Sequence, residues 1–384
     1  MDIERLKSTF RGIYQTEPIL VKSPGRINII GEHTDYNGGF VMPAAIDKAI
    51  YVAVSKRDDE EIHLYSESYQ ASYTSSVAAI EKSDLSWANY VLGVADQMIK
   101  RGYKISGFNL YLDGNVPLGA GLSSSAALEC ATAFALDHLN DLGISQMDLA
   151  LISQKAEHVF AGVNCGIMDQ FASVFGKQDH AVLLDCRTMK YEYIPLALEG
   201  YKLVLLNTNV KHSLSDSAYN KRRSQCEQGV AWISAHHPEV TSLRDANVNM
   251  LEEFVKPKDA EVYQKCKYVV EEIGRIQKAA EALRQGDLVA LGKLMLETHK
   301  GLSQDYEVSC KELDFLVDYV KDLDHVLGAR MMGGGFGGCT INIVKDENID
   351  ALISEVSVLY EEEFSLSIDA YVVETANGSA LIDA

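Results

Sequence analysis

The chain has 384 residues, of which 47% are hydrophobic and 23% are charged, a composition typical of a globular protein long enough for two domains. Its formal net charge of −20 at pH 7 argues against nucleic acids and anionic membranes as primary ligands, because an acidic surface repels their phosphates. A bound nucleotide would have to be held by backbone N–H groups, a metal ion and a few local cations.

The cysteines and the N-terminal segment both predict a cytoplasmic protein. The seven cysteines form no CxxC pair, and several lie in apolar runs, as expected of free thiols in a reducing compartment. The N-terminal segment MDIERLKSTFRGIYQ lacks the apolar core of a signal peptide, and no stretch reaches the apolar length of a membrane span. We find no internal repeat, low-complexity tract or Pro/Ser-rich linker.

Short strands and helices alternate in the first half of the chain. The hydrophobic pattern predicts strands at 50–59, 61–68, 108–116 and 181–186. Between them, one helix is predicted from about Ser123 through an alanine-rich segment. Another starts at Ser145, with Asp148 in capping-box spacing, and stops at Gly162.

The second half is richer in helix. The pattern predicts a strand at 201–208, helices from about 217 to 324, a strand at 339–344, a helix at 349–364 and a last strand at 368–375. Because strands and helices interleave without a regular βαβ rhythm, we expect an α+β fold rather than a doubly wound parallel sheet. A boundary near 186–200 predicts two domains, 1–190 and 191–384.

The segment 117–125 (PLGAGLSSS) has the features of a phosphate-binding loop. It leads from a predicted strand into a helix, whose first N–H groups and dipole attract anions. Gly119 and Gly121 let the backbone approach a ligand, and the serines add hydroxyl groups. No GxxxxGK[ST] motif occurs, so this is not a Walker A loop. A tight turn with a serine N-cap is the alternative interpretation.

A second glycine-rich segment, 333–338 (GGGFGG), formally matches the GxGxxG dinucleotide fingerprint. That fingerprint opens a helix, whereas residues 339–344 have the pattern of a strand. The sequence therefore predicts a loop that lies against a ligand or another loop. The alternative is a flexible hairpin.

Segment 25–39 (GRINIIGEHTDYNGG) combines a short strand, with Arg26 at its start, and a polar loop. The loop holds Glu32, His33 and Asp35 before an Asn-Gly-Gly turn. Each residue alone has the character of a turn former or a solvated charge. Together, closely spaced acceptors suit a ligand with several hydroxyl groups, because each carboxylate accepts two or more hydrogen bonds.

Segment 164–170 (NCGIMDQ) opens a predicted helix with Asp169 in its first turn. An acidic side chain near a helix N-terminus is explained by the helix dipole alone. The same dipole would keep the carboxylate ionised and ready to accept a proton, so both interpretations can hold.

Together, these segments closely resemble the motifs of the galactokinase family, in the GHMP small-molecule kinase superfamily. Segment 25–39 resembles the galactokinase signature, 117–129 (PLGAGLSSSAALE) resembles the ATP motif, and 328–343 (GARMMGGGFGGCTINI) resembles the third glycine-rich motif. Their order and spacing also agree, so the resemblance covers essentially the whole chain. It implies an N-terminal ribosomal-protein-S5-domain-2-like domain and a C-terminal ferredoxin-like domain, with the site between them.

The resemblance implies transfer of the γ-phosphate of ATP to the anomeric 1-hydroxyl of D-galactose, with Mg²⁺ as cofactor. Asp169 would be the catalytic carboxylate, as a base or an orienting charge, and Arg26 would stabilise transition-state charge. The implied sugar contacts are Glu32, His33, Thr34, Asp35, Gly166 and Tyr219. The implied ATP contacts are Gly119, Ala120, Gly121, Leu122, Ser123, Ser124 and Ser125, with Ser66 as a further nucleotide contact. The implied Mg²⁺ ligands are Ser125 and Glu157.

Three other kinds of protein share some of these motifs. A kinase for N-acetylgalactosamine or another sugar is the nearest, but segment 33–39 leaves no obvious room for a bulky 2-substituent. Mevalonate and homoserine kinases share the glycine motifs and lack this sugar loop. A non-catalytic galactose and ATP sensor would lose residues of the serine-rich motif, whereas 121–126 is complete and Asp169 is present. The oligomeric state stays open, and a monomer is compatible with the sequence.

Overall fold

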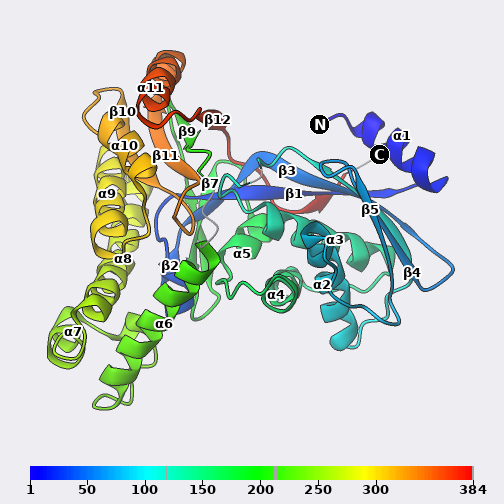
Figure 1. Ribbon diagram of the computed structural model, residues 1–384, viewed down its shortest axis with the longest axis horizontal. Helices are drawn as coiled ribbons and strands as arrows, with labels where there is room; N and C mark the ends of the chain where they lie inside the picture. The colour runs from blue at the N-terminus through cyan, green and yellow to red at the C-terminus, as the bar shows by residue number, and fades with distance from the viewer. Residues whose placement is uncertain (118, 211–214, 383–384) are drawn as a thin grey trace.

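The computed structural model describes residues 1–117, 119–210 and 215–382, so Leu118 of the predicted phosphate loop lies outside the described residues. The described chain forms sheets of six, four and three strands with helices packed around them (Figure 1). The predicted α+β arrangement is therefore confirmed. Among the described residues, no helix combines the length and the apolar character that crossing a bilayer requires.

The six-stranded sheet has the order β13-β1-β3-β6-β4-β5. Every neighbouring pair is antiparallel except β4 and β6, which are parallel. Its strands are β1 (Ile19–Asn28), β3 (Pro43–Lys56), β4 (Glu61–Ser66), β5 (Ala71–Ser76), β6 (Phe108–Gly114) and β13 (Ala380–Leu381). The end of the chain thus returns to the sheet formed by its beginning, and both termini lie near this sheet in Figure 1.

Helices cover both faces of this sheet. On one face lie α2 (Ser86–Lys100), α3 (Ser124–Leu139), α4 (Gln146–Ala156) and α5 (Met168–Phe175) (Figure 1). On the other face, Leu6 and Phe10 of α1 (Ile3–Tyr14) pack against strand residues such as Tyr51 and Tyr111. The alanine-rich sequence of α3 lets it lie close to the sheet, and most of its residues are buried.

Local sequence signals set the ends of several helices. Asp2 caps α1 by accepting a hydrogen bond from the Arg5 N–H at 3.1 Å. Ser145 caps α4 through the Asp148 N–H, also at 3.1 Å, which confirms the predicted start. After Ala156 the helix continues as one π-helical turn (Glu157–Ala161) and ends at Gly162, whose φ of 79° suits glycine.

The second half of the chain supplies the four-stranded antiparallel sheet, in the order β10-β11-β9-β12. Its strands are β9 (Tyr201–Asn207), β10 (Val326–Met331), β11 (Cys339–Lys345) and β12 (Asp369–Val373). The surrounding helices are α6 (Ser215–Ser234), α7 (Val248–Phe254), α8 (Ala260–Arg284), α9 (Leu288–Lys300), α10 (Lys311–Val320) and α11 (Ile349–Phe364). A small sheet of β2 (Phe40–Val41), β7 (His180–Asp185) and β8 (Tyr191–Pro195) completes the strands.

The two halves share one apolar core. Leu203, Leu205 and Ile341 of the four-stranded sheet belong to the same buried cluster as Val52 and Leu110 of the six-stranded sheet. The predicted division at residue 190 stays a prediction, and β13 shows that the chain crosses back after it.

The predicted strands and helices are present with modest shifts at their ends, but the prediction for Arg26 was wrong. Arg26 lies near the end of β1, not at the start of a strand. Pro24 and Gly25 have the character of strand breakers, but β1 continues past them because its register against β3 shifts between Pro24 and Arg26. Helices α1 and α2 and strands β2, β5, β8, β10 and β13 were not predicted.

A buried ion pair joins the two halves. Arg330 of β10 is fully buried, and one of its terminal nitrogens lies 2.9 Å from the carboxylate of Glu32. Its Nε donates to the carbonyl of Ile29 at 3.0 Å, and its other hydrogen bonds reach the carbonyls of Met331 and Asn28. The guanidinium thereby fixes the segment that follows β1 to the four-stranded sheet.

We predict that Arg330→Met destabilises the protein by about 3–5 kcal/mol, because it leaves the Glu32 carboxylate buried without its cation. Chemical denaturation of both proteins measures this difference. The control is Arg284→Met, which removes an exposed ion pair to Glu192 and should cost less than about 1 kcal/mol. Equal, small losses for the two variants would contradict the structural importance of Arg330.

Candidate active site

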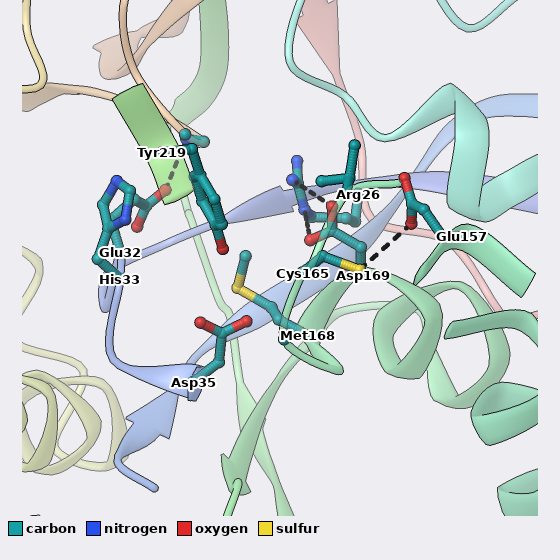
Figure 2. A pocket seen from close by; sticks show the side chains of 13 residues that line it. Arg26, Glu32, His33, Asp35, Glu157, Cys165, Met168, Asp169 and Tyr219 are labelled. Atoms are coloured by element: carbon teal, nitrogen blue, oxygen red, sulfur yellow. Dashed lines mark hydrogen bonds and ion pairs between the residues drawn. The ribbon is translucent and has the colours of Figure 1, made fainter. Parts of the chain in front are cut away.

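A cavity of about 140 Å³ opens where the loop after β1, the start of α5 and the glycine loop 333–338 meet (Figure 2). It is lined by Arg26, Glu32, His33, Asp35, Glu157, Val163, Cys165, Gly166, Met168, Asp169, Tyr219, Gly333 and Gly334. The structure thus brings the predicted catalytic residues and the predicted sugar contacts, apart from Thr34, to one cavity.

Arg26 and Asp169 form a bidentate pair at the cavity wall (Figure 2). The Arg26 Nε and one terminal nitrogen donate to the two carboxylate oxygens of Asp169, at 2.8 and 2.9 Å. The other terminal nitrogen donates to the Gly121 carbonyl at 2.6 Å, and the Ser123 hydroxyl donates to Asp169. These donors hold Asp169 in one orientation, and such charge-assisted contacts are among the stronger hydrogen bonds in proteins.

The side chains of Arg26 and Asp169 differ in how far they are exposed. The side chain of Arg26 is 5% exposed and that of Asp169 is 26% exposed. Both side chains line the cavity, but Asp169 is the more accessible of the two to a ligand, and Arg26 orients its carboxylate. Asp169 also lies in the first turn of α5, where the helix dipole favours a negative charge.

Asp35 lies on another side of the same cavity, below Tyr219 in Figure 2. A Cβ on Gly166 would lie 1.8 Å from the Asp35 carboxylate, so glycine at position 166 is what allows Asp35 this place. Burial, and less strongly the charge of Asp169, raises the pKa of Asp35 to about 6, against a hydrogen bond from the Tyr36 N–H. Asp35 is thus ionised at neutral pH but protonates in mildly acidic solution.

Glu32 lines the cavity with its carboxylate already bound by the protein. It is 1% exposed and accepts hydrogen bonds from the Gly333 N–H at 2.8 Å and from the Asn28 amide, besides its pair with Arg330. A ligand hydroxyl could still donate a further hydrogen bond to Glu32, because a carboxylate accepts several.

His33 belongs to an aromatic cluster. Its Nδ1 lies 2.7 Å from the Tyr36 hydroxyl, which lies 2.9 Å from that of Tyr306. The His33 ring also contacts the Tyr219 ring, with centroids 5.3 Å apart. Burial lowers the pKa of His33 to about 3, so the ring is neutral at physiological pH and forms an uncharged part of the wall.

Thr34 does not line the cavity. Its hydroxyl donates to the Gly31 carbonyl at 2.9 Å and to the Phe40 carbonyl, within its own loop. The side chain is fully buried and closes the loop that carries Glu32 and Asp35. A direct contact between Thr34 and a sugar stays a prediction.

The predicted phosphate loop has the backbone conformations that its sequence indicates. Gly119 and Gly121 have φ of 75° and 73°, and Ser123, with φ 57°, precedes the first residue of α3. A Cβ on Gly333 would lie 3.6 Å from the Gly121 carbonyl, so the two glycine-rich loops lie against each other. This confirms the prediction that loop 333–338 packs on another loop.

A second cavity, of about 50 Å³, lies beside the start of α3. Its wall includes Ser124 and Ser125 of the phosphate loop and the fully buried Ser66, and it contains Tyr69 and Trp87, whose rings stack with centroids 6.4 Å apart. An apolar, aromatic wall beside a phosphate loop suits a nucleotide base. The role of Ser66 as a nucleotide contact stays a prediction.

Glu157 lies between the two cavities, on the π-helical turn. Glu157 lines the first cavity and Ser125 lines the second, and the Ser125 hydroxyl acts to lower the pKa of the Glu157 carboxyl group. Burial, followed by the nearby charge of Asp169, raises the pKa of Glu157. A cation bound here would offset both effects.

Several residues that line the cavities were not predicted from the sequence. Cys165 and Met168 flank Gly166 and Asp169, so their place in segment 164–170 was an available signal. Tyr69 and Trp87 carry no such signal, because only folding brings them beside the phosphate loop.

Three family models match the chain in order. The galactokinase galactose-binding signature matches residues 8–56, the N terminal domain of GHMP kinases matches 89–177, and the C terminal domain of GHMP kinases matches 279–361. The first covers the loop with Glu32 and Asp35, and the second covers the phosphate loop and Asp169.

Curated proteins and solved structures agree with these matches. Galactokinase from Thermotoga petrophila is 42% identical over 358 residues, covering 93% of this chain and 98% of that protein. Galactokinase from Fusobacterium nucleatum is 41% identical over 391 residues, covering 99% and 100%. The structure of Lactococcus lactis galactokinase complexed with galactose has a TM-score of 0.95 at 36% identity, covering 99% of this chain and 100% of that chain.

More distant structures share the fold alone. Mevalonate kinase from Methanococcus jannaschii superposes with a TM-score of 0.66 at 18% identity, covering 94% of this chain. The predicted two-domain GHMP kinase fold is thereby confirmed. From the family models and the near full-length identity to curated galactokinases, the chain belongs to the galactokinase family of the GHMP kinases.

Proposed function

We propose that Asp169, oriented by Arg26, accepts a hydrogen bond from the anomeric hydroxyl of D-galactose while that hydroxyl attacks the γ-phosphate of MgATP. The products are galactose 1-phosphate and ADP. The observation that carries the proposal is the bidentate pair of Arg26 and Asp169 between the first cavity and the phosphate loop. Galactose as the substrate is supported by the galactose complex of the Lactococcus lactis relative.

Positioning and charge account for most of the catalysis of phosphoryl transfer. Asp169 would fix the direction of the sugar hydroxyl and accept its proton as the new O–P bond forms. Arg26 would balance the negative charge that gathers between the carboxylate and the phosphate. The N–H groups at the start of α3, together with the backbone of 119–122, would hold the phosphates.

Ser125 and Glu157 fit Mg²⁺, which prefers a few protein oxygens and keeps several waters. They offer a hydroxyl and a carboxylate, and the Ser125 hydroxyl lies near enough to act on the pKa of Glu157. Within the described residues, no group of three or more His, Cys, Asp or Glu side chains is arranged to hold a metal by itself, so phosphate oxygens and water would complete the shell. When bound, Mg²⁺ would neutralise phosphate charge.

A cytoplasmic location is part of the proposal. All seven cysteines are free in the structure, which suits a reducing compartment.

We predict that Asp169→Asn lowers kcat by about 10²–10⁴-fold while ADP still binds, because the amide keeps the shape and loses the charge and the proton acceptor. Steady-state rates and ADP calorimetry measure this. Asp148→Asn, in the first turn of α4 with a half-exposed side chain, is the matched control and should leave kcat unchanged. Near-normal turnover of Asp169→Asn would refute its catalytic role.

We predict that the KM for galactose rises as the pH falls below about 6, because Asp35 then binds a proton and loses its negative charge. The folded-state pKa is raised, so the ionised form is complete only above that value. The rise approaches about tenfold per pH unit if only the ionised form binds sugar. KM profiles of wild type and Asp35→Asn test this, and a variant that retains the wild-type acid limb would exclude Asp35 as its source.

We predict that Asp35 also contributes to the preference for galactose over glucose, which differ in the orientation of the 4-hydroxyl. A buried carboxylate that loses its hydroxyl partner costs roughly 1–3 kcal/mol or more, so it rejects the wrong epimer. Asp35→Ala should reduce kcat/KM for galactose steeply and for glucose slightly. An unchanged ratio with a lowered melting temperature would show that Asp35 only shapes the loop.

A further inference from the structure

We propose that Gln170 is a positioning residue for Glu157, whose carboxylate it orients toward Ser125 and the magnesium. This inference rests on the proposed magnesium site of Ser125 and Glu157. Gln170 follows Asp169 directly in α5 and is fully buried. It is not a predicted site residue, and it lines neither of the two cavities.

The amide nitrogen of Gln170 lies between two buried carboxyl groups. It donates to Glu157 Oε2 at 2.7 Å and to Glu129 Oε2 at 3.1 Å. Glu129 belongs to α3, four residues after Ser125, and is fully buried. One side chain of α5 thus connects the helix that follows the phosphate loop with the π-helical turn that carries Glu157.

The hydrogen bonds on Glu157 are uneven. Gln170 and the Cys165 thiol, at 3.4 Å, both donate to Oε2. Because these donors hold Oε2 from within the protein, Oε1 is the oxygen that stays available to a cation shared with Ser125. A carboxylate without such donors could rotate about its terminal torsion, which is broad for glutamate.

The sequence of α5 explains how one turn serves both groups. Consecutive side chains of an α-helix point about 100° apart. Asp169 therefore faces the sugar cavity, while Gln170 faces Glu129 and Glu157. Neighbouring residues of one helix therefore serve the two parts of the site: Asp169 faces the sugar, and Gln170 orients Glu157, the proposed magnesium ligand.

A purely structural role for Gln170 makes a different prediction. If the Gln170 amide only satisfies two buried carboxyl groups, its removal would lower the stability of the protein and would not change the affinity for magnesium. Partners that orient metal ligands instead cost metal affinity about 10–100-fold when they are removed. Metal affinity, not stability, therefore distinguishes the two roles.

The test is Gln170→Met, which keeps the length of the side chain and removes the donor. ADP binding is measured by calorimetry in a magnesium titration, with no turnover needed. We expect the magnesium concentration for half-maximal ADP binding to rise about tenfold or more, with galactose binding unchanged. The matched control is Gln97→Met, which removes a buried amide donating to Asp96 at 2.8 Å on α2 and should leave the titration unchanged.

Glu157→Gln separates this inference from the proposed function. If Glu157→Gln leaves the magnesium titration unchanged, the magnesium site itself is wrong. If Glu157→Gln shifts the titration and Gln170→Met does not, the site stands and the positioning role is overturned. Equal losses of galactose and ADP binding in Gln170→Met would also overturn it.

Should Gln170→Met fail to fold, Gln170→Asn is measured by the same titration with the same outcomes, because its shorter amide cannot reach both carboxyl groups.

Discussion

The buried guanidinium of Arg26 is the point on which the whole site depends. Its donors connect Asp169, at the start of α5, with the Gly121 carbonyl of the phosphate loop, while its own backbone belongs to β1. Three segments far apart in the sequence therefore share one fixed geometry. Because a guanidinium is planar and stays charged, it can hold this arrangement where a lysine could not.

A second constraint comes from the other half of the chain. The backbone after β1 is held by Arg330, by the Tyr268 hydroxyl on the Glu32 carbonyl at 3.2 Å, and by the buried Glu272 carboxylate on the Gly31 N–H at 3.0 Å. The loop that lines the sugar cavity is thus fixed by α8 and β10. These contacts explain how a polar loop, which its sequence alone would place at the surface, forms a fixed wall of the sugar cavity.

Much of this could be predicted from the sequence, because the motifs carry local signals. Gly121 and Asp169 stand in segments whose glycines, serines and helix starts have direct physical meaning. What could not be predicted depends on contacts between distant residues. The register shift in β1 could not be foreseen, so Arg26 was placed at the wrong end of its strand. Nothing in the sequence around Arg330 indicates that it is buried against Glu32. The role of Gln170 follows only from its contacts with Glu129 and Glu157.

The central claim is that Arg26 and Asp169 act as one unit, and a double-mutant cycle on kcat tests it most directly. The singles Arg26→Met and Asp169→Asn are compared with the double variant, with circular dichroism and ADP binding as checks of folding. If the pair is one unit, the double variant is about as slow as the slower single variant, because the second change removes nothing further. If the two losses multiply, each residue acts independently, and the account is contradicted.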